Sequence, residues 1–412
     1  MGTRRGHGEG SVFKDSRGLW TAKIELPPIN GIRRRKVIRR KDKGALLAEL
    51  RKAQQDLHKR GDLPTAGKTV GDWFNYWIES IAAKEVTPGT LAGYRGVVKK
   101  HIVPGLGANT KIDRVSAVVV RRMHDRMTEA GLSSTYALNA HNIASGGMKA
   151  AVREGLIGSN PFAMVSPPRK AVAELDVLDL DESVRLLEVL SSRLDGAQRA
   201  TSLLAGARRG EVIGLELDRV DDVLDLSWQL RRLPWSHGCE GRCGYKRGGD
   251  CPDRKIEARP GYEYRQIKGG LFWTRPKSRK GWRIIPLVEP LRPILERHIE
   301  TMTPNRYGLL FARPDGDPID PDADSASWRD LMKETFGEDR NCRLHDLRHA
   351  AADLMYLAGV DEDIIQEILG HTVRATTRAY KKRGNTARLV AAMEKMGALV
   401  TPPARTLETG GV

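Results

Sequence analysis

Residues 344–380 read LHDLRHAAADLMYLAGVDEDIIQEILGHTVRATTRAY. Apolar residues recur at helical spacing from Leu344 to Leu354, which predicts a buried stripe along a helix. His345 and Arg348 lie three positions apart, so the same helix would hold both side chains on a neighbouring face. A histidine and an arginine that share a helix face form a cationic, hydrogen-bonding pair, and the stretch therefore points to phosphate chemistry.

The second half of this stretch adds a histidine and a tyrosine. Asp361 is predicted to cap a second helix with an isoleucine-rich apolar stripe, and Gly370 is placed to end it. His371 would then lie on a turn. A short third helix would bring the hydroxyl of Tyr380 back towards the first helix, so that all four polar groups would gather.

Taken singly, each of these residues fits an ordinary polar helix edge or protein surface. Taken together, HxxR starting at His345, LGH ending at His371 and Tyr380 nine residues later resemble the tyrosine recombinase (phage integrase) family. The resemblance implies a multidomain α+β fold. Its parts would be a small N-terminal domain of a β-sheet and a helix, an all-α (four-helix, SAM-like) core-binding domain, and a mainly α catalytic domain with a small antiparallel β-sheet.

Two further motifs match this family. In the segment GARRGE, Arg208 stands two residues after the glycine, as the arginine box of the family requires, with Arg209 as the alternative. Glu211 would orient an arginine. The segment PKSRKGWRIIPL resembles the β-hairpin motif of the family, in which Lys277 would be catalytic and Lys280, near the expected turn, is the local alternative.

The resemblance implies metal-independent and ATP-independent breakage and rejoining of DNA strands. Arg208 and Arg348 would clamp the non-bridging oxygens of a phosphodiester. Tyr380 would attack phosphorus to form a 3′-phosphotyrosyl bond while His345 accepts its proton, and Lys277 would protonate the leaving 5′-oxygen. The implied catalytic set, which needs no cofactor, is Arg208, Lys277, His345, Arg348, His371 and Tyr380.

The charge of the chain indicates a polyanionic partner. Among 412 residues, 69 lysines and arginines outnumber 52 acidic residues, a formal charge of +17, and residues 1–60 carry +11 from 17 basic and six acidic side chains. No apolar run approaches the roughly 20 residues that span a bilayer, and the segment MGTRRGHGEG lacks the apolar core of a signal peptide. We therefore expect a DNA-associated protein in the cytoplasm of a bacterial host, without membrane contact.

Residues 1–63 are predicted to form a small basic domain. Runs rich in β-formers at 11–14, 20–26 and 35–39 precede an amphipathic helix near 46–57. The arrangement resembles the arm-binding domain at the front of many phage integrases, and strands can enter a DNA groove. A solvated basic tail is the alternative. The predicted DNA contacts in this domain are Arg33, Arg34, Arg35, Arg39 and Arg40.

Residues 67–166 are predicted to form a helical domain. Its four helices resemble the core-binding domain of the family, and a solvated helix face is the alternative for each basic residue on them. Apolar stripes and helix-start signals predict these helices at 70–81, 87–102, 116–131 and 133–155. The predicted DNA contacts here are Arg95, Lys99 and Lys100.

The catalytic domain is predicted over residues 170–400. Strands are expected at 223–230 and 271–275, and residues 231–270 between them depart from the simple family pattern. Three cysteines and a histidine within 15 residues of this insert can close a tetrahedral zinc site. The alternative is a glycine-rich surface insert with reduced thiols. The predicted ligands of the structural zinc are His237, Cys239, Cys243 and Cys251.

The predicted function is site-specific recombination of double-stranded DNA by an integrase, which inserts or excises a phage or mobile element at core and arm sites. It would act as a homotetramer on DNA, with a directionality factor and a host DNA-bending protein as further partners. A C-terminal helix near 389–396 would dock on a neighbouring protomer or pack within its own chain. The alternatives are an Xer-like resolvase, a type IB topoisomerase-like relaxase and a catalytically silent DNA-binding protein.

Overall fold

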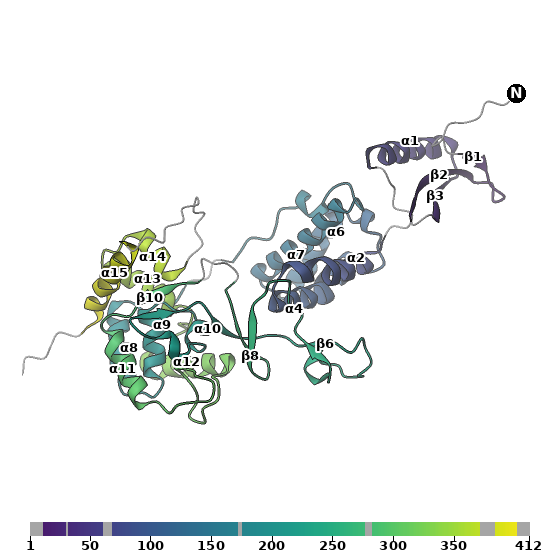
Figure 1. Ribbon diagram of the computed structural model, residues 1–412. Coiled ribbons are helices and arrows are strands. Elements are labelled where there is room, and N and C mark those ends of the chain that lie inside the picture. Colours follow the sequence, from purple (N-terminus) through teal and green to yellow (C-terminus); the bar gives the residue numbers. More distant parts are fainter. Residues whose placement is uncertain are drawn as a thin grey trace, which may run out of the picture. The chain divides into compact units, whose positions relative to one another are not determined.

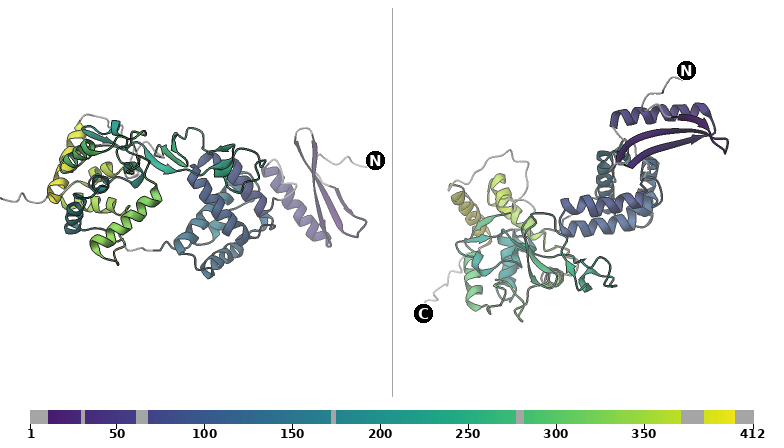
Figure 2. Two further views of the ribbon diagram at one scale, coloured as in Figure 1. Left: turned by 90° about the horizontal axis from the view of Figure 1, so that it is seen from below. Right: turned by 45° about the vertical axis from the view of Figure 1, so that its right-hand side comes forward.

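The computed structural model (Figure 1) describes residues 11–29, 32–60, 68–171, 175–276, 282–370 and 384–401. The chain divides into two compact units. The first extends to residue 172 apart from residues 87–89, which group with the remainder of the chain in the second. Figure 2 shows the same elements from two further directions. No helix in the described ranges is long and apolar enough to cross a membrane.

The N-terminal part of the first unit is a three-stranded antiparallel sheet with one helix. The first two strands are joined at Asp15, whose carboxylate accepts from the N–H of Leu19, and Gly18 in this turn has a φ of 78°. Alternation along the middle strand buries Ile24 in one apolar cluster with Leu46 of the helix. The elements, all predicted, are β1 (Ser11–Lys14), β2 (Trp20–Ile29), β3 (Ile32–Arg40) and α1 (Lys43–Arg60), in the sheet order β1-β2-β3.

The other part of the first unit, residues 68–171, is helical. Two of its helices meet closely at Gly147, where an added Cβ would lie 2.5 Å from Cε1 of Phe74 and where Trp73 Nε1 donates to the glycine carbonyl at 3.0 Å. All four predicted helical stretches are present. The elements are α2 (Val70–Tyr76), a π-helical segment (Trp77–Ala82), α3 (Ala83–Glu85), α4 (Pro88–Val97), a second π-helical segment (Val98–Ile102), α5 (Val103–Leu106), α6 (Ala117–Glu129) and α7 (Ser134–Arg153).

The helices of the second unit are organised around one buried helix, α13 (Leu347–Leu357), which contacts α9, α14 and α15. Its buried apolar residues belong to the largest core cluster among the described residues. The helices are α8 (Leu180–Leu190), α9 (Gly196–Leu204), α10 (Arg209–Val212), α11 (Leu291–Thr301), α12 (Pro321–Phe336), α13, α14 (Glu362–Leu369) and α15 (Gly384–Val400).

The strands of the second unit differ from the prediction. The expected strand at 223–230 is two strands, and the two strands flanking residues 277–281 do not pair as a simple hairpin: among the described residues they lie in separate sheets. One sheet pairs β4 (Val223–Asp225) with β10 (Ile284–Pro286), and the other has the order β5 (Gln229–Arg232), β9 (Leu271–Thr274), β8 (Tyr264–Lys268). The alternation of apolar and polar residues does not reveal that Leu226 and Ser227, both buried, interrupt the strand that was expected at 223–230.

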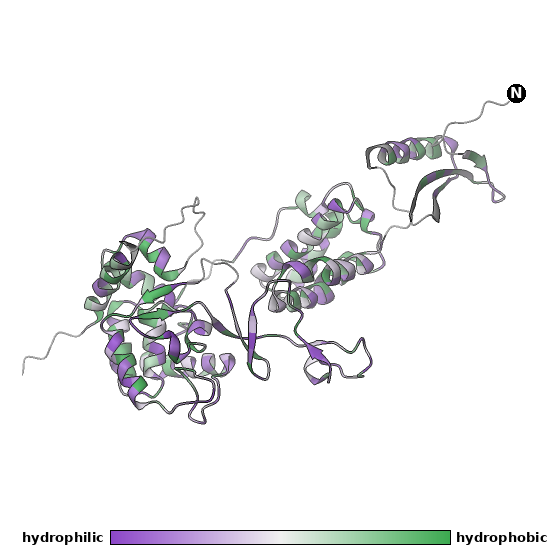
Figure 3. Cartoon of the chain, in the orientation of Figure 1, coloured by the Kyte–Doolittle hydropathy of each residue, from purple (hydrophilic) through white to green (hydrophobic). Residues whose placement is uncertain are grey.

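Two features lie at the edges of this unit. The insert adds the short strands β6 (Ser236–His237) and β7 (Arg254–Lys255), and Figure 3 shows β6 in purple, as hydrophilic, where β10 is green. Helix α15 packs within its own chain, because Met393 and Met396 are 2% and 1% exposed in the main core cluster. This helix therefore packs in cis within the single chain that the structure contains, and docking on a neighbouring protomer stays a prediction.

Candidate active site

Arg348 lies on α13 and is almost fully buried, with 4% of its surface exposed. Its Nη1 donates to the carbonyl oxygen of Gly206 at 2.6 Å. Its Nη2 is buried and has no hydrogen-bond partner among the described residues. Burial, and then the charges of Arg283 and Arg208, lower the pKa of Arg348. A buried guanidinium nitrogen that lacks an acceptor is costly, so this atom is suited to an oxygen of a bound anion.

Arg208 is the residue immediately before α10, and Glu211 orients its side chain. Its backbone N–H and its Nη1 donate to the two oxygens of that carboxylate at 2.8 and 2.7 Å. Its Nη2 lies 3.5 Å from the carbonyl oxygen of Gly370, and 34% of the side chain is exposed. The arginine is therefore held on one side and open on the other, which leaves donors for a ligand.

The same Glu211 binds a second guanidinium, that of Arg283, whose Nη2 lies 2.5 Å from the carboxylate. Arg283 Nη1 donates to the carbonyls of Ile368 and Leu369 at 3.1 and 2.6 Å. Both side chains of the pair are buried, at 4% and 1% exposure. Breaking a buried pair by removing one partner costs about 3–5 kcal/mol, so Arg283 fixes both Glu211 and the end of α14, just ahead of Gly370.

Gly206 lies where these groups meet, and no residue with a Cβ fits at its position. Its φ is 53°, and an added Cβ would lie 2.5 Å from Cδ2 of Leu369 and 3.3 Å from Cβ of Ala351. Its carbonyl oxygen accepts from Arg348 at 2.6 Å and lies 3.4 Å from Nη2 of Arg283. The glycine of the segment GARRGE is therefore part of the framework that holds the arginines.

His345 lies in a turn and not on the helix, contrary to the prediction. Helix α13 begins at Leu347, and residues 344–346 form a turn before it. The buried carboxylate of Asp346 holds this turn, because it accepts from the backbone N–H and from Nε of Arg343, both at 2.9 Å. The helical spacing of the apolar residues does not reveal that the Asp346 carboxylate holds the chain in a turn.

The ring of His345 is exposed and lies beside the arginines. Partial loss of hydration against the surrounding protein, and then the positive charges of Arg348 and His349, lower the pKa of His345. Its ring centre is 5.9 Å from that of His349. An imidazole with a lowered pKa is neutral at neutral pH, so it can accept a proton.

Three predicted catalytic residues, Lys277, His371 and Tyr380, lie outside the described residues, as does the alternative Lys280. The structure describes the residue before His371: Gly370 ends α14 in the left-handed conformation, with a φ of 62°, as predicted. Because Gly370 is also the residue that Arg208 approaches, His371 follows directly on a described part of the site.

Arg209, the alternative in the arginine box, is engaged elsewhere. Its Nη1 donates to the carbonyl of Pro321 at 2.9 Å and to the hydroxyl of Ser325 at 2.5 Å, both on α12. Of the two arginines, Arg208 is the one with a described contact to Gly370. This difference favours Arg208 as the phosphate ligand.

The eight residues predicted to contact DNA fall into three groups. The side chains of Arg33 and Arg34 lie outside what the structure describes. Arg35, Lys99 and Lys100 are exposed. Exposed ion pairs are weak, so a phosphate can compete for an arginine that forms one. The remaining three form such pairs: Arg39 with Asp15, Arg40 with Glu49 and Arg95 with Glu79.

The four predicted zinc ligands converge in the insert. Their ligand atoms all lie within 4.8 Å of one another, and His237 Nδ1 is 3.3 Å from Sγ of Cys243 and 4.0 Å from Sγ of Cys239. The backbone N–H and then the thiol of Cys243 lower the pKa of Cys239 to about 6, while the pKa of Cys243 is raised. All four cysteines of the chain lie in the described ranges, and none is in a disulfide. A thiolate-rich tetrahedral donor set of this size fits Zn²⁺.

Arg283 has a role in the site that the sequence prediction did not assign. A signal was present, because Arg283, Ile285 and Leu287 alternate along β10 and the residues directly beside its ends, and all three are buried. An arginine on the buried face of a strand needs a charged partner. The identity of that partner, Glu211, depends on a contact across 72 residues and cannot be read from the strand.

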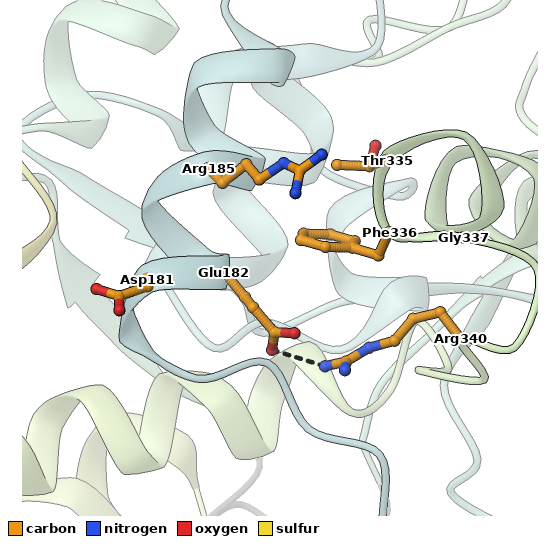
Figure 4. A pocket seen from close by; sticks show the side chains of 7 residues that line it. All are labelled: Asp181, Glu182, Arg185, Thr335, Phe336, Gly337 and Arg340. Carbon is orange, nitrogen blue, oxygen red and sulfur yellow. Dashed lines mark hydrogen bonds and ion pairs between the residues drawn. The ribbon is translucent and has the colours of Figure 1, made fainter.

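A pocket lies away from these residues, between the start of α8 and the end of α12 (Figure 4). Arg185 and Arg340 both lie over the ring of Phe336, at 5.4 and 5.7 Å from its centre, and Arg340 donates to Glu182 at 2.7 Å. The pocket contains none of the predicted catalytic residues. Its full lining is Asp181, Glu182, Arg185, Thr335, Phe336, Gly337 and Arg340.

Comparison with known proteins agrees with this geometry. Residues 263–385 match the phage integrase family, and residues 69–127 match the phage integrase N-terminal SAM-like domain. An integrase of Saccharopolyspora erythraea is 28% identical over 403 residues, which cover 89% of this chain and 91% of that protein. A putative prophage phiRv2 integrase of Mycobacterium tuberculosis is 26% identical over 338 residues, which cover 80% and 79% of the two chains.

Solved structures share the fold. The Tn1549 transposon integrase in complex with a circular intermediate DNA has a TM-score of 0.58 at 19% identity, covering 80% of this chain and 99% of that chain. A lambda integrase tetramer bound to a Holliday junction has a TM-score of 0.50 at 16% identity, covering 90% and 98%. The chain contains the catalytic domain and the N-terminal SAM-like domain of phage integrases, and it is a tyrosine recombinase, an enzyme that cleaves and rejoins DNA through a tyrosine.

Proposed function

We propose that this recombinase is an integrase that cuts and rejoins double-stranded DNA at specific sites to insert or excise a phage or another mobile element. The observation that carries the proposal is the approach of Arg348 to Gly206 and of Arg208 to Gly370, with Nη2 of Arg348 buried and lacking an acceptor among the described residues. Two such guanidiniums suit a phosphodiester, whose non-bridging oxygens gain charge as phosphorus becomes five-coordinate. His371 would donate to one of these oxygens.

The remaining groups move protons and form the covalent bond. The phenol oxygen of Tyr380 attacks phosphorus and gives its proton to His345. The bond to the 5′-oxygen breaks as the 3′-phosphotyrosyl bond forms, and the ammonium of Lys277 protonates the leaving oxygen. A 5′-hydroxyl of another strand reverses the step without ATP, because the phosphotyrosyl ester conserves the energy of the broken bond. Tyrosine recombinases need no cofactor for this chemistry.

A nicked suicide substrate, from which the short cleaved strand diffuses away, tests the proposal. We expect a covalent protein–DNA adduct that resists denaturation. Ligation of the trapped strand to the 5′-hydroxyl of a second duplex should follow. A protein that binds this DNA without an adduct would be a silent binder, and one that reseals only its own nick would be a relaxase.

The rate of cleavage should fall at acidic pH because His345 must be neutral to accept the proton. An ordinary histidine has a pKa of about 6.5, and the pKa of His345 is lowered, chiefly by the surrounding protein. Single-turnover cleavage should therefore be level down to pH ~6.5 and decline only below it. His345→Ala should remove this decline, whereas the matched control His349→Ala should keep it. A decline that persists in His345→Ala would contradict the role.

We propose a division of labour among three parts of the chain. Residues 67–166 would hold the core site, residues 170–400 would carry the chemistry, and residues 1–63 would bind separate arm sites. By analogy with the lambda integrase tetramer on a Holliday junction, the active form would be a homotetramer on DNA. A directionality factor and a host DNA-bending protein would complete the assembly.

Removal of residues 1–63 should spare cleavage of a core site and impair recombination that depends on arm sites. The residues carry a basic sheet and helix with a core of their own, and a linked second module binds at high effective concentration. The isolated fragment should prefer some duplex sequences, since strands in a groove can read base edges. Equal affinity for all duplexes in a competition assay would mean that residues 1–63 are a basic tail that contacts only phosphate. Full recombination activity after deletion of residues 1–63 would favour an Xer-like resolvase.

We further propose that the insert holds one structural Zn²⁺ through His237, Cys239, Cys243 and Cys251. Zinc bonds to sulfur of about 2.3 Å and to nitrogen of about 2.0 Å put tetrahedral ligand atoms roughly 3.5–3.8 Å apart. The separations within this cluster, all at or below 4.8 Å, need only small movements to match. The metal would hold together residues 237–251 of the insert and would take no part in catalysis.

Protein purified without chelator should contain about one equivalent of zinc. Cys251→Ser should lower the zinc content and the thermal stability of the insert, because fewer than four ligands remain. Cys342→Ser is the matched control, since Cys342 is buried outside the insert, and it should keep the metal. Cleavage of the core site should persist after chelation. Elemental analysis that finds no zinc would refute the site.

A further inference from the structure

The insert of the catalytic domain buries very few side chains. Of residues 237–259, all of which the structure describes, the buried ones are Cys239 and Cys251, two members of the proposed zinc cluster. Ordering a segment of chain costs conformational entropy, which the burial of apolar side chains normally offsets. In the insert the metal would offset this cost instead. The insert therefore adds no apolar core to the domain, and what it contributes lies at its surface.

One stretch of this surface, residues 241–249 (GRCGYKRGG), is basic, and we call it the insert tip. It carries Arg242, Lys246 and Arg247 and no acidic residue, and all three basic side chains are exposed. Within the described part of the chain, none of the three forms an ion pair. Tyr245 stands among them with 57% of its surface exposed. The insert tip thus presents three cations and a phenol to solvent.

The proposed zinc cluster holds the insert tip from within. Cys243, one of the four ligands, lies inside the tip, and its thiol accepts from the backbone N–H of Tyr245. Nε of Arg242 donates to the carbonyl oxygen of Cys239, another ligand, at 3.0 Å. The backbone that carries the exposed cations is therefore tied to the cluster at two points, and zinc would fix it further.

Strand β7 adds two more cations beside the cluster. Arg254 and Lys255 are exposed, and Arg254 lies directly opposite the ligand His237 in the pairing of β6 with β7. Cζ of Arg254 lies 5.2 Å from the ring centre of Trp235, and that ring lies 5.4 Å from the ring of Phe272 on β9. These ring contacts join the basic surface of the insert to the sheet β5-β9-β8 of the catalytic domain.

We propose that the insert tip binds the phosphate backbone of duplex DNA through Arg242, Lys246 and Arg247. The inference rests on the proposed function, which supplies both the DNA and the zinc. Arginine and lysine donate to phosphate oxygens, and a tyrosine hydroxyl such as that of Tyr245 can join them. Lysine is depleted in protein–protein interfaces, so the tip fits DNA better than a protein partner. Such contacts position a protein on DNA without reading its base sequence.

The salt dependence of DNA binding tests this contact in the full-length protein. The logarithm of the binding constant falls with the logarithm of the salt concentration, with a slope of about 0.9 for each phosphate contacted. Lys246→Ala combined with Arg247→Ala should lower this slope by roughly 1.8, the value for two lost contacts. Fluorescence anisotropy on a long duplex that contains the core site measures it.

The matched control removes the same two charges elsewhere. Arg329→Ala combined with Lys333→Ala takes an exposed arginine and an exposed lysine from α12 and should leave the slope unchanged. A slope that is equally unchanged in the variant of the insert tip would overturn the contact. If that variant then failed only in assembling a tetramer on DNA, the tip would be a protein interface.

Two further measurements separate this inference from the proposed function. Elemental analysis should find the same zinc content in the wild-type protein and in the tip variant, and chelation should lower the slope of the wild-type protein alone. A full slope after chelation would overturn the part given to zinc. The tip variant at saturating concentration should still form the covalent adduct. A wild-type protein that forms no adduct would contradict recombination, whereas the slope alone decides the contact of the tip.

Discussion

Tyr380→Phe should form no covalent adduct with a suicide substrate, while its affinity for core-site DNA should be nearly unchanged. The substitution removes one oxygen, the proposed nucleophile, and a phenyl ring cannot form a phosphoester. The cationic contacts of Arg208 and Arg348 with phosphate remain. Adducts would be measured on a denaturing gel and affinity by fluorescence anisotropy, because a defect in binding would otherwise look like a defect in chemistry.

Tyr356→Phe is the matched control for this variant. Tyr356 is a 55% exposed tyrosine on α13, so its loss should leave both cleavage and binding intact. An adduct formed by Tyr380→Phe would show that another residue is the nucleophile.

Arg348→Ala should slow cleavage ~10²-fold or more, the scale for removing one donor to the charge of a transition state. Nη1 of Arg348 is used by Gly206, and Nη2 is the buried atom that the proposal gives to a phosphate oxygen. Arg348→Lys should recover little, because a lysine ammonium cannot serve both acceptors as a planar guanidinium does.

Two controls separate chemistry from folding, since Arg348 is 4% exposed and its removal can destabilise the core. Arg208→Ala, at a side chain that is 34% exposed, should lose a similar factor with little change in thermal stability. A methylphosphonate substrate, which lacks one charged non-bridging oxygen, should reduce the deficit of both variants. Arg209→Ala should retain cleavage, because Arg209 binds α12. Equal losses on charged and neutral substrates would place Arg348 outside the transition-state contacts.

Local patterns in the sequence predicted much of this fold, since the features involved are set by neighbouring residues. The alternation that buries Ile24, the proline that opens α4 and the left-handed Gly370 all act within a few positions of the chain. The motif that contains Arg208 is also local, since Arg208 stands at the start of α10, two residues after Gly206. These features depend on spacing, which a sequence displays directly.

Other parts of the site depend on partners far apart in the chain. Arg283 reaches Glu211 and the end of α14, and the buried Asp346 bends the chain so that His345 precedes α13. Arg275 likewise stacks on Trp228, which comes far earlier in the chain. A sequence shows that such residues exist, and their pairing follows only from the folded chain.

The central claim is that Tyr380 becomes linked to the 3′-phosphate of the cleaved strand. Protein trapped on a suicide substrate can be digested with nuclease and protease, and the modified peptide identified by mass spectrometry. The account predicts a nucleotide attached at Tyr380 in the wild-type protein. A nucleotide attached to any other residue, or a trapped strand joined to the protein through its 5′ end, would contradict it.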